Sequence, residues 1–327
     1  ILTEVQGTAT TFFDNSLRFK IVDSLSKRYH FFHPMLEFLE VFWLRDGFDI
    51  ICGNPPWIKL EFNVKDVISD NYPEVVIRNV SSPIIRQCIE DFIGNSSMAK
   101  LYMNDESEQA CSTTFLNASC NYPLLIGQKT NLYKCVLSNC LEMSSSKGYI
   151  GLLCPEGIYD DPKGQPLRRV IYKRLRYHFQ YVNALLLFAE VDWHTKFGCH
   201  IIGNTQKTAD FYSINNLYNP STIDGCLAHD GHGVCGGIKD EKGKWNITPH
   251  RDRVVHFSDK EISLLSNTFE DGTTQDCAKL ISLHSQLILK VIEKISEYPT
   301  HVKDIHNIVT TCFDESGAQR DGITKRE

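Results

Sequence analysis

The sequence lacks any apolar segment long enough to cross a membrane. Its longest apolar run, residues 184–189, falls far short of the roughly 18 residues that a membrane helix needs. The first residues lack the basic start and apolar middle of a secretory signal. No internal repeat or low-complexity tract is present, and 42% of the 327 residues are hydrophobic. This composition excludes a disordered or collagen-like chain, and the length predicts about two domains.

Positive charge is also scarce. The chain has 34 Lys and Arg against 40 Asp and Glu, a formal net charge of -6, which excludes a generic nucleic-acid coat because phosphate binding needs cationic surface. Any DNA contact must therefore come from a local basic patch or from sequence outside this chain. Five basic residues within 167–181 are candidates for phosphate contacts, although a solvated helix face explains them equally well: Arg168, Arg169, Lys173, Arg174 and Arg176.

The 12 cysteines lack the short regular spacing of a disulfide-stabilised scaffold. Cysteines within apolar stretches, such as Cys52 and Cys154, behave as small hydrophobes when free, so a reducing cytoplasm is predicted. A weak zinc candidate has Cys and His at spacings of three, but lacks paired Cys-x-x-Cys knuckles, and a plain surface loop is the favoured interpretation. Its residues are Cys226, His229, His232 and Cys235.

Apolar periodicity predicts an α/β domain with a largely parallel sheet. Helices are expected over residues 12–45, over a segment that Asn131 caps and that reaches about 141, over 167–181 and over 278–295. Strands are expected over 48–52, 149–154, 182–188 and 197–202. Prolines predict irregular structure over 58–125. After about residue 210 the composition changes to loops rich in Gly, Asn and Asp, with a hairpin predicted near 236–245. This change indicates an approximate domain boundary near residue 210.

One motif indicates chemistry. The apolar strand 48–52 leads through Gly53 into Asn54, Pro55, Pro56 and Trp57, at the strand end where α/β proteins place ligands. The prolines stiffen the loop and remove backbone donors. The Asn54 side-chain oxygen and the Pro55 carbonyl offer two acceptors, which suit an NH2 group, while the Trp57 ring can stack on a planar group.

An aromatic amine is a poor nucleophile because its lone pair is conjugated with the ring. Two acceptors can draw the nitrogen towards a tetrahedral shape and favour the positive charge that develops during attack on a methyl donor. The motif therefore suits a planar amide or an aromatic amine. A rigid turn after a strand is the alternative without function. His178, His194 and His200 have no visible nucleophile or acid partner in the sequence and receive no role.

The segment Gly53-Asn-Pro-Pro-Trp57 resembles the Asn-Pro-Pro-aromatic motif of DNA adenine-N6 methyltransferases, with Trp where Tyr is commoner. The flanks, residues 31–42, 128–134 and 148–159, resemble the large fused restriction-modification and phage-defence type, and the likeness covers roughly residues 28–205. Residues 190–198 resemble a late segment whose aromatic touches a flipped adenine, which makes Phe197 a second stacking candidate. Asp49, Gly53, Pro155 and Glu156 are candidates for supporting positions around the motif.

The resemblance implies that the fold is the C-terminal part of a Rossmann-like methyltransferase sheet. It also implies that the enzyme uses S-adenosylmethionine as cofactor and double-stranded DNA as substrate, in a bacterial or archaeal cytoplasm. No strand followed by Gly-x-Gly precedes Asn54, so the loop that binds the cofactor is expected upstream of Ile1. The chain is therefore interpreted as an internal fragment, and its cofactor-binding residues are unassigned. Residues 1–210 would be a partial catalytic domain, and 211–327 an extension towards a target-recognition domain. We expect the fragment alone to be inactive.

Two alternatives stay open. Protein-glutamine and RNA methyltransferases also act on a substrate NH2 group with two donors, so a motif of this kind would suit them as well. A module that keeps the methyltransferase shape but serves as a DNA-binding partner or scaffold is the alternative from another class. A Gly-x-Gly after a strand in upstream sequence would favour the enzyme over the module.

Overall fold

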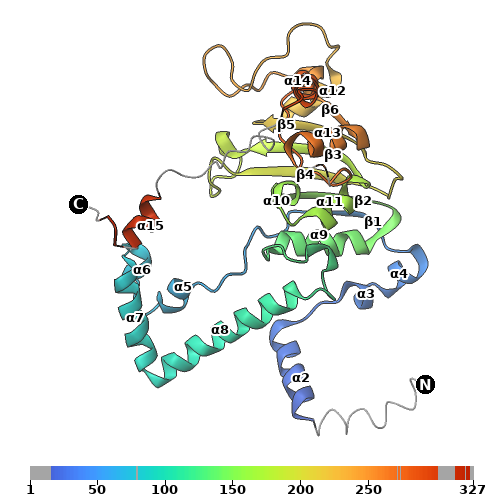
Figure 1. Ribbon diagram of the computed structural model, residues 1–327. Coiled ribbons are helices and arrows are strands. Elements are labelled where there is room, and N and C mark those ends of the chain that lie inside the picture. Colours follow the sequence, from blue (N-terminus) through green and yellow to red (C-terminus); the bar gives the residue numbers. More distant parts are fainter. Residues whose placement is uncertain are drawn as a thin grey trace.

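The computed structural model describes residues 16–78, 80–270, 272, 274–300, 314–320 and 322–324. Its centre is a mixed sheet of six strands in the order β1-β2-β4-β3-β5-β6 (Figure 1). The strands are β1 (Phe48–Gly53), β2 (Ser144–Pro155), β3 (Leu175–Val182), β4 (Lys196–Ile202), β5 (Asp210–Leu217) and β6 (Val255–Ser258). The pairs β1–β2 and β3–β5 are parallel, whereas β4 is antiparallel to both neighbours and β6 to β5. Strands β1, β2, β3 and β5 therefore run in one direction.

One face of the sheet carries the main core. Apolar side chains such as Ile150, Leu152 and Phe211 are buried there against helices. The helices are α9 (Leu132–Met143), α10 (Gly157–Asp160), α11 (Gln165–Tyr172), α13 (Asp259–Phe269) and α14 (Gln286–Ser296). A second, smaller cluster on the other face packs Tyr181 and Phe197 against Cys226 of α12 (Ser221–Ala228). Two short 3-10 turns, η2 (Asn183–Leu185) and η3 (Arg251–Arg253), connect these elements.

The segment before β2 is mostly helical. Helices α2 (Leu17–Tyr29), α3 (Pro34–Glu37) and α4 (Leu39–Arg45) precede β1, and this agrees with the helical prediction for 12–45 over the described residues. The prediction of irregular structure over 58–125 is wrong, because prolines there begin helices instead of interrupting them. The segment forms α5 (Val64–Ile68), α6 (Glu74–Ile77), α7 (Ser82–Gly94), the 22-residue α8 (Ser96–Asn117) and η1 (Pro123–Leu125).

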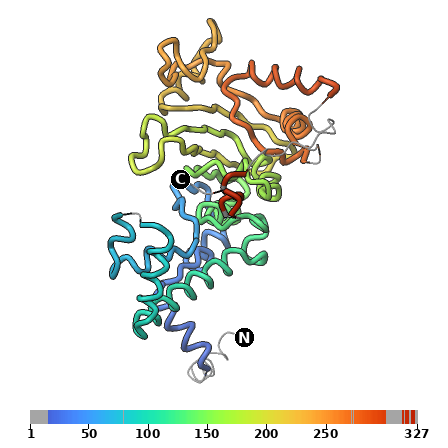
Figure 2. Tube along the Cα trace, turned by 60° about the vertical axis from the view of Figure 1, so that its left-hand side comes forward, coloured from blue at the N-terminus to red at the C-terminus, as the bar shows by residue number. Residues whose placement is uncertain are grey.

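Helices α5 to α8 have a small core of their own, made by Ile68, Val75, Cys88 and Phe92. They lie to one side of the sheet, as Figures 1 and 2 both show. No helix of the described residues is long and apolar enough to span a membrane. Helix α15 (Glu315–Arg320) is the last described element.

Several predicted elements differ from those in the structure. The helix predicted over 167–181 ends at Tyr172, and residues 175–182 form β3 instead. The strand predicted over 182–188 does not form beyond Val182, where the 3-10 turn η2 begins. The helix predicted over 278–295 begins only at Gln286. The strand expected at 149–154 is the longer β2, and that at 197–202 is β4. Asn131 caps α9 as predicted, because its side chain accepts a hydrogen bond from the Tyr133 amide.

The change of composition near residue 210 does not interrupt the sheet. Strand β5 begins at Asp210 and pairs along β3, and β6 pairs with β5. The loop-rich segment between α12 and η3 contains an isolated antiparallel bridge between Lys239 and Trp245, in agreement with the predicted hairpin. The strands before and after residue 210 therefore belong to one sheet.

Candidate functional site

The motif loop begins where β1 ends. Gly53, the last residue of β1, pairs with Leu152 of the parallel strand β2, so Asn54 lies beyond the carboxyl end of β1. The Asn54 and Pro56 side chains are exposed, while Pro55 is buried. The Ile58 carbonyl accepts a hydrogen bond of 3.0 Å from the Leu132 amide at the start of α9. The loop is thereby held between the edge of the sheet and α9, with the Asn54 amide facing solvent.

Trp57 is fixed in its orientation. Its indole Nε1 donates a 3.2 Å hydrogen bond to the Leu153 carbonyl of β2. Its ring lies edge-on to Phe188, with centroids 5.5 Å apart, and tilted against Phe197 at 5.6 Å. The ring is only half-buried, so its position is set by the protein while part of it stays accessible to a ligand.

Phe197 supports Trp57 instead of lying opposite it. The Phe197 ring is buried and stacks on Tyr181, with centroids 5.3 Å apart and an interplanar angle of 8°. Aromatic rings in direct contact have centroids about 4.5–7 Å apart, and the Trp57–Phe197 separation falls in that range. A planar base therefore does not fit between Trp57 and Phe197 in this conformation, and the outer part of the Trp57 ring is the stacking surface.

Glu156 is the buried member of the predicted supporting set. Its carboxylate oxygens lie 3.0 and 3.1 Å from His178 Nε2, and Gln180 Nε2 donates a 3.0 Å hydrogen bond to Oε2. Burial raises the pKa of this carboxyl, but the charge and hydrogen bond of His178, the nearby His200 and the Gln180 amide outweigh burial and lower the pKa below its usual value. Glu156 therefore stays ionised inside the protein.

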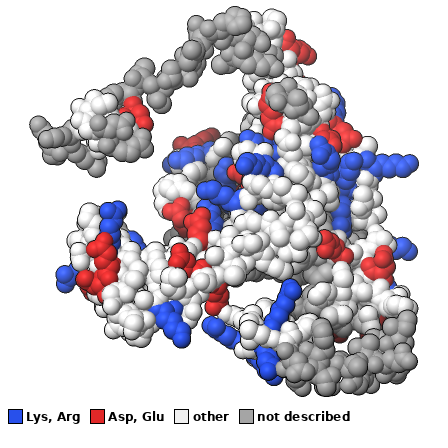
Figure 3. Space-filling model, turned by 60° about the horizontal axis from the view of Figure 1, so that its bottom comes forward, with Lys and Arg blue, Asp and Glu red and all other residues white. Residues whose placement is uncertain are grey.

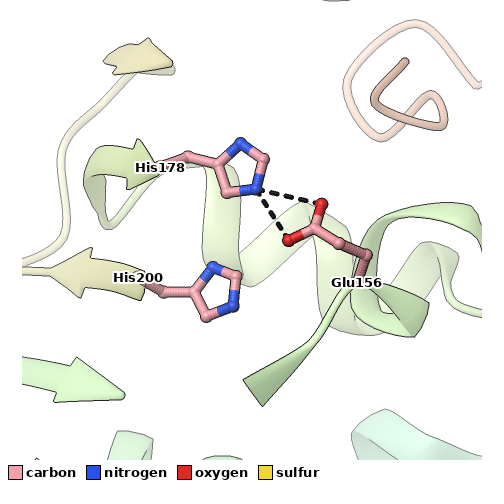
Figure 4. Close-up of side chains that lie close together, drawn as sticks. All are labelled: Glu156, His178 and His200. Carbon is pink, nitrogen blue, oxygen red and sulfur yellow. Dashed lines mark hydrogen bonds and ion pairs between the residues drawn. The ribbon is translucent and has the colours of Figure 1, made fainter. Parts of the chain in front are cut away.

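His200 completes a cluster with Glu156 and His178, shown in Figure 4. Its Nδ1 lies 2.9 Å from the Tyr159 hydroxyl and its Nε2 lies 3.3 Å from the Cys154 carbonyl. Burial lowers the pKa of His200 to about 4, although the Glu156 charge opposes the change. Among the described residues, these three form the one group of His, Cys, Asp or Glu whose ligand atoms all lie within 4.8 Å of one another.

The other supporting candidates lie apart from this cluster. Asp49 is exposed on β1 and lies 3.9 Å from Arg45. Gly53 ends β1, where an added Cβ would meet only a Leu152 methyl at 3.8 Å, so no close approach requires glycine. Pro155 is half-buried and pairs with Phe197 across β2 and β4. Asp49 and Gly53 thus lie on the edge strand β1, whereas Pro155 directly precedes Glu156 in the chain.

Most of the basic candidates make contacts within the protein. Arg168 is almost fully buried, and its guanidinium donates to the Cys277 and Asp161 carbonyls at 2.8 and 2.6 Å. Arg169 pairs with Asp276 at 2.7 Å. Arg174 donates to the Gly203 and Leu141 carbonyls, and Arg176 donates to Asn204. Lys173 is half-buried. The expected helix face of five phosphate contacts does not form, because the helix ends at Tyr172 and Arg168 points inward.

The structure does not bring the Cys/His loop together. Cys226 is buried in the second core cluster, whereas His232 is exposed. His229 Nδ1 accepts a hydrogen bond from the Gly231 amide, and the Cys235 thiol lies against the Gly236 carbonyl. Among the described residues, these four do not form a group whose ligand atoms lie close enough together to hold one metal ion.

Sequence reasoning did not find the roles of His178 and His200. Residue 178 fell within a predicted helix, so its alternation with Gln180 along a strand was hidden. The signal is visible once the strands are paired, because His178 and His200 are direct neighbours across β3 and β4. Tyr159 and Ser213, which hold their Nδ1 atoms, come from a helix and a strand far away in the sequence.

No protein family model and no curated protein matches the chain. Some solved structures are similar. A modification subunit of a putative type I restriction enzyme from Vibrio vulnificus YJ016 gives a TM-score of 0.33 at 11% identity, covering 75% of this chain and 40% of that one. The EcoKI M protein, a type I restriction enzyme, gives 0.29 at 11% identity, covering 50% and 42%.

The DNA-bound type ISP restriction-modification enzyme LlaBIII gives a TM-score of 0.30 at 12% identity, with 62% of this chain and 13% of that chain covered. The chain thus spans less than half the length of each of these proteins. TM-scores and identities of this size are too low to carry an argument about function, which has to come from the site itself.

Proposed function

We propose that this chain is part of a DNA adenine-N6 methyltransferase of the restriction-modification or phage-defence type, and that it holds the target adenine. The observation that carries the proposal is the motif loop. It places an exposed Asn54 amide, the stiff Pro55-Pro56 backbone and the fixed, half-buried Trp57 ring together beyond the carboxyl end of β1. No other segment of the described residues combines these three features.

The loop suits the exocyclic amine of a flipped adenine. The Asn54 side-chain oxygen and the Pro55 carbonyl would accept the two amine hydrogens, and the outer part of the Trp57 ring would stack on the base. Holding both hydrogens favours positive charge on the nitrogen as it attacks a methyl group. Phe197 and Phe188 would act as positioning residues that keep the Trp57 ring in place.

Among the described residues, no glycine-rich loop between a strand and a helix precedes the motif loop. The first described strand is β1, which follows helix α4 directly, and neither Gly47 nor Gly53 is part of a Gly-x-Gly loop between a strand and a helix. S-adenosylmethionine would supply the methyl group, and we place the residues that bind it outside this chain. The six-stranded sheet, with β5 and β6 included, would then belong to the adenine-holding part of a catalytic domain, and an extension towards a target-recognition domain would follow it instead of beginning at 211.

DNA contacts in this proposal come from few residues of this chain. Acidic and basic side chains are interspersed on the face that Figure 3 shows, in keeping with the net charge of -6. Arg168, Arg169 and Arg174 are engaged by protein groups. The phosphate-binding surface of the whole enzyme would therefore lie mainly on parts outside this chain.

The substitution Asn54→Ala in the full-length enzyme tests the proposal. We expect the rate of methyl transfer to DNA to fall by about 100-fold or more, as when a donor or acceptor to developing charge is removed, while DNA affinity changes little. Asn104→Ala, on the exposed surface of α8, is the matched control and should keep full activity. Retained turnover in Asn54→Ala would refute the assigned role.

The identity of the methylated product separates the alternatives. N6-methyladenine in DNA supports the proposal, methylglutamine or methylated RNA supports the related enzymes, and no methylated product from the full-length protein supports a non-catalytic DNA-binding or scaffold module. The two-acceptor loop is common to all the enzymes, so only the product distinguishes them.

A further inference from the structure

We propose that Glu156, His178 and His200 bind a divalent transition-metal ion of the zinc type, at a site separate from the motif loop. Glu156 follows β2, His178 lies on β3 and His200 on β4. The cluster lies on the face of the sheet that carries the main core, where Tyr159 of α10 covers it. Phe197, which touches Trp57, belongs to the smaller cluster on the other face.

The sheet makes the ligand atoms converge. His200 and His178 are directly paired across β4 and β3, and their rings are parallel within 9°, with centroids 5.4 Å apart. Gly198, two residues before His200, leaves space for the carboxylate, because a Cβ there would come within 2.4 Å of Glu156 Oε1 and 2.5 Å of His200 Cε1. Figure 4 shows the Glu156 carboxylate directed towards the two imidazoles.

The other nitrogen of each imidazole already has a partner. His178 Nδ1 lies 2.9 Å from the Ser213 hydroxyl, and His200 Nδ1 lies 2.9 Å from the Tyr159 hydroxyl. Metal-binding histidines commonly donate their second ring N–H to such an oxygen, which fixes the ring and its tautomer. His178 Nε2 faces the Glu156 carboxylate at 3.0 Å, and His200 Nε2 lies 3.3 Å from the Cys154 carbonyl, a contact that a bound ion would replace.

The charge of the cluster also favours a cation. Glu156 is buried, and within the described part of the chain it forms an ion pair with His178 but with no Lys or Arg. A buried carboxylate without a full countercharge is unfavourable. A divalent ion would supply that countercharge.

Gln180 provides an independent sign of a missing donor. Its Nε2 donates to Glu156 Oε2 and to the Ser282 hydroxyl at 2.7 Å, yet its Oε1 is buried with no hydrogen-bond partner among the described residues. Two nitrogens and one carboxylate leave a fourth position of a tetrahedral zinc shell for water. A metal-bound water would be the donor that Gln180 Oε1 lacks.

Metal content of the purified, untagged protein is the first measurement. We expect about one equivalent of zinc after dialysis against buffer, its loss on treatment with a chelator, and a fall in Tm that added Zn²⁺ reverses. Co²⁺ substitution should give visible d–d absorption without the near-ultraviolet charge-transfer band of thiolate ligands. That band would instead place the ion at the Cys226–Cys235 loop and overturn the proposal.

Variants locate the ion. Glu156→Gln and His200→Gln should each weaken Zn²⁺ binding by more than about 100-fold, and Tyr159→Phe, which keeps the buried ring, by about 10–100-fold as expected for an outer partner. His256→Gln is the matched control, because His256 pairs with Asp210 on the surface, 2.7 Å away. It should bind zinc like the unmodified protein, and so should Cys235→Ser.

The unmodified protein keeps the proposal falsifiable even if a buried variant fails to fold. Folded protein that binds no Zn²⁺, Co²⁺ or Fe²⁺ at micromolar concentration would overturn it, and so would zinc binding that survives His200→Gln. Neither result depends on methyl transfer, so the metal site and the proposed enzyme activity can fail separately.

Discussion

Arg168 and Arg169 are neighbours in the sequence but have opposite environments. Both are basic residues near the start of α11, and the sequence pattern grouped them as phosphate contacts. The structure buries Arg168 between the Asp161 and Cys277 carbonyls, whereas Arg169 forms a half-exposed pair with Asp276. At the scale of single residues, charge type alone did not distinguish a structural arginine from a surface one.

Arg168→Ala should destabilise the protein strongly. It removes charged hydrogen bonds to the Cys277 and Asp161 carbonyls, of which the Asp161 carbonyl keeps the Gly164 amide as a donor. We therefore expect the free energy of unfolding to fall by about 2–4 kcal/mol. Arg169→Ala, which breaks an exposed pair, should cost about 1 kcal/mol or less. Chemical denaturation of both variants measures the difference, and equal costs would contradict the assigned burial.

Gly198→Ala should also be destabilising, through a different cause. The added methyl group would collide with Glu156 Oε1 and the His200 ring, so we expect a loss of about 1–3 kcal/mol from overpacking. Gly151→Ala on the neighbouring strand is the control, because its Cβ would meet atoms only at 3.6 Å or beyond. Thermal unfolding compares the two, and an unaffected Gly198→Ala protein would mean that the cluster is looser than described.

At the scale of elements, the segment 167–181 shows why a helix and a strand were merged. Leu167, Ile171 and Leu175 have helical spacing, and all three are buried. The chain nevertheless turns at Lys173–Arg174, where the Arg174 amide donates to the Ile171 carbonyl and β3 then pairs with β4 and β5. Strand pairing with distant residues decided the second half, and local periodicity carries no information about such partners.

The cap of α9 offers a test at this scale, since the helix also anchors the motif loop through Ile58. Asn131→Ala removes the side-chain acceptor for the Tyr133 amide and should lower the free energy of unfolding by about 1 kcal/mol. Asn131→Ser retains a capping oxygen and should recover most of that loss. Urea denaturation monitors both, and no difference between Ala and Ser would rule out the capping role.

At the scale of the whole molecule, the sheet is covered unevenly. The main core fills one face, whereas on the other face a row of apolar side chains is exposed, including Ile50, Tyr149, Tyr177 and Tyr212. Tyr177 pairs with Ile201 and Tyr212 across the strands, which places them on one side of the sheet. Ile50 is 71% exposed although it lies within a strand, and a contiguous apolar area of this kind favours association.

Replacing Ile50, Tyr177 and Tyr212 together by Thr tests this surface. Thr keeps strand propensity, so the folded state should persist with a loss of about 1 kcal/mol or less from the cross-strand ring pair. We expect lower binding of a hydrophobic dye and less self-association in light scattering. Val234→Thr, a 92% exposed loop position, is the control and should change neither. Unchanged dye binding in the triple variant would show that this face is not the exposed apolar surface.

The sequence by itself determined the α/β class, the strands β1, β2 and β4, the cap of α9 and the position of the Asn54–Trp57 loop after a strand. These depend on local patterns of apolar residues, prolines and capping side chains. Only the tertiary structure decided that Phe197 supports Trp57, that Arg168 is buried and that Glu156 meets His178 and His200. The reason is physical: strand pairing joins residues that are distant in the sequence, and burial then determines which charges face protein and which face water.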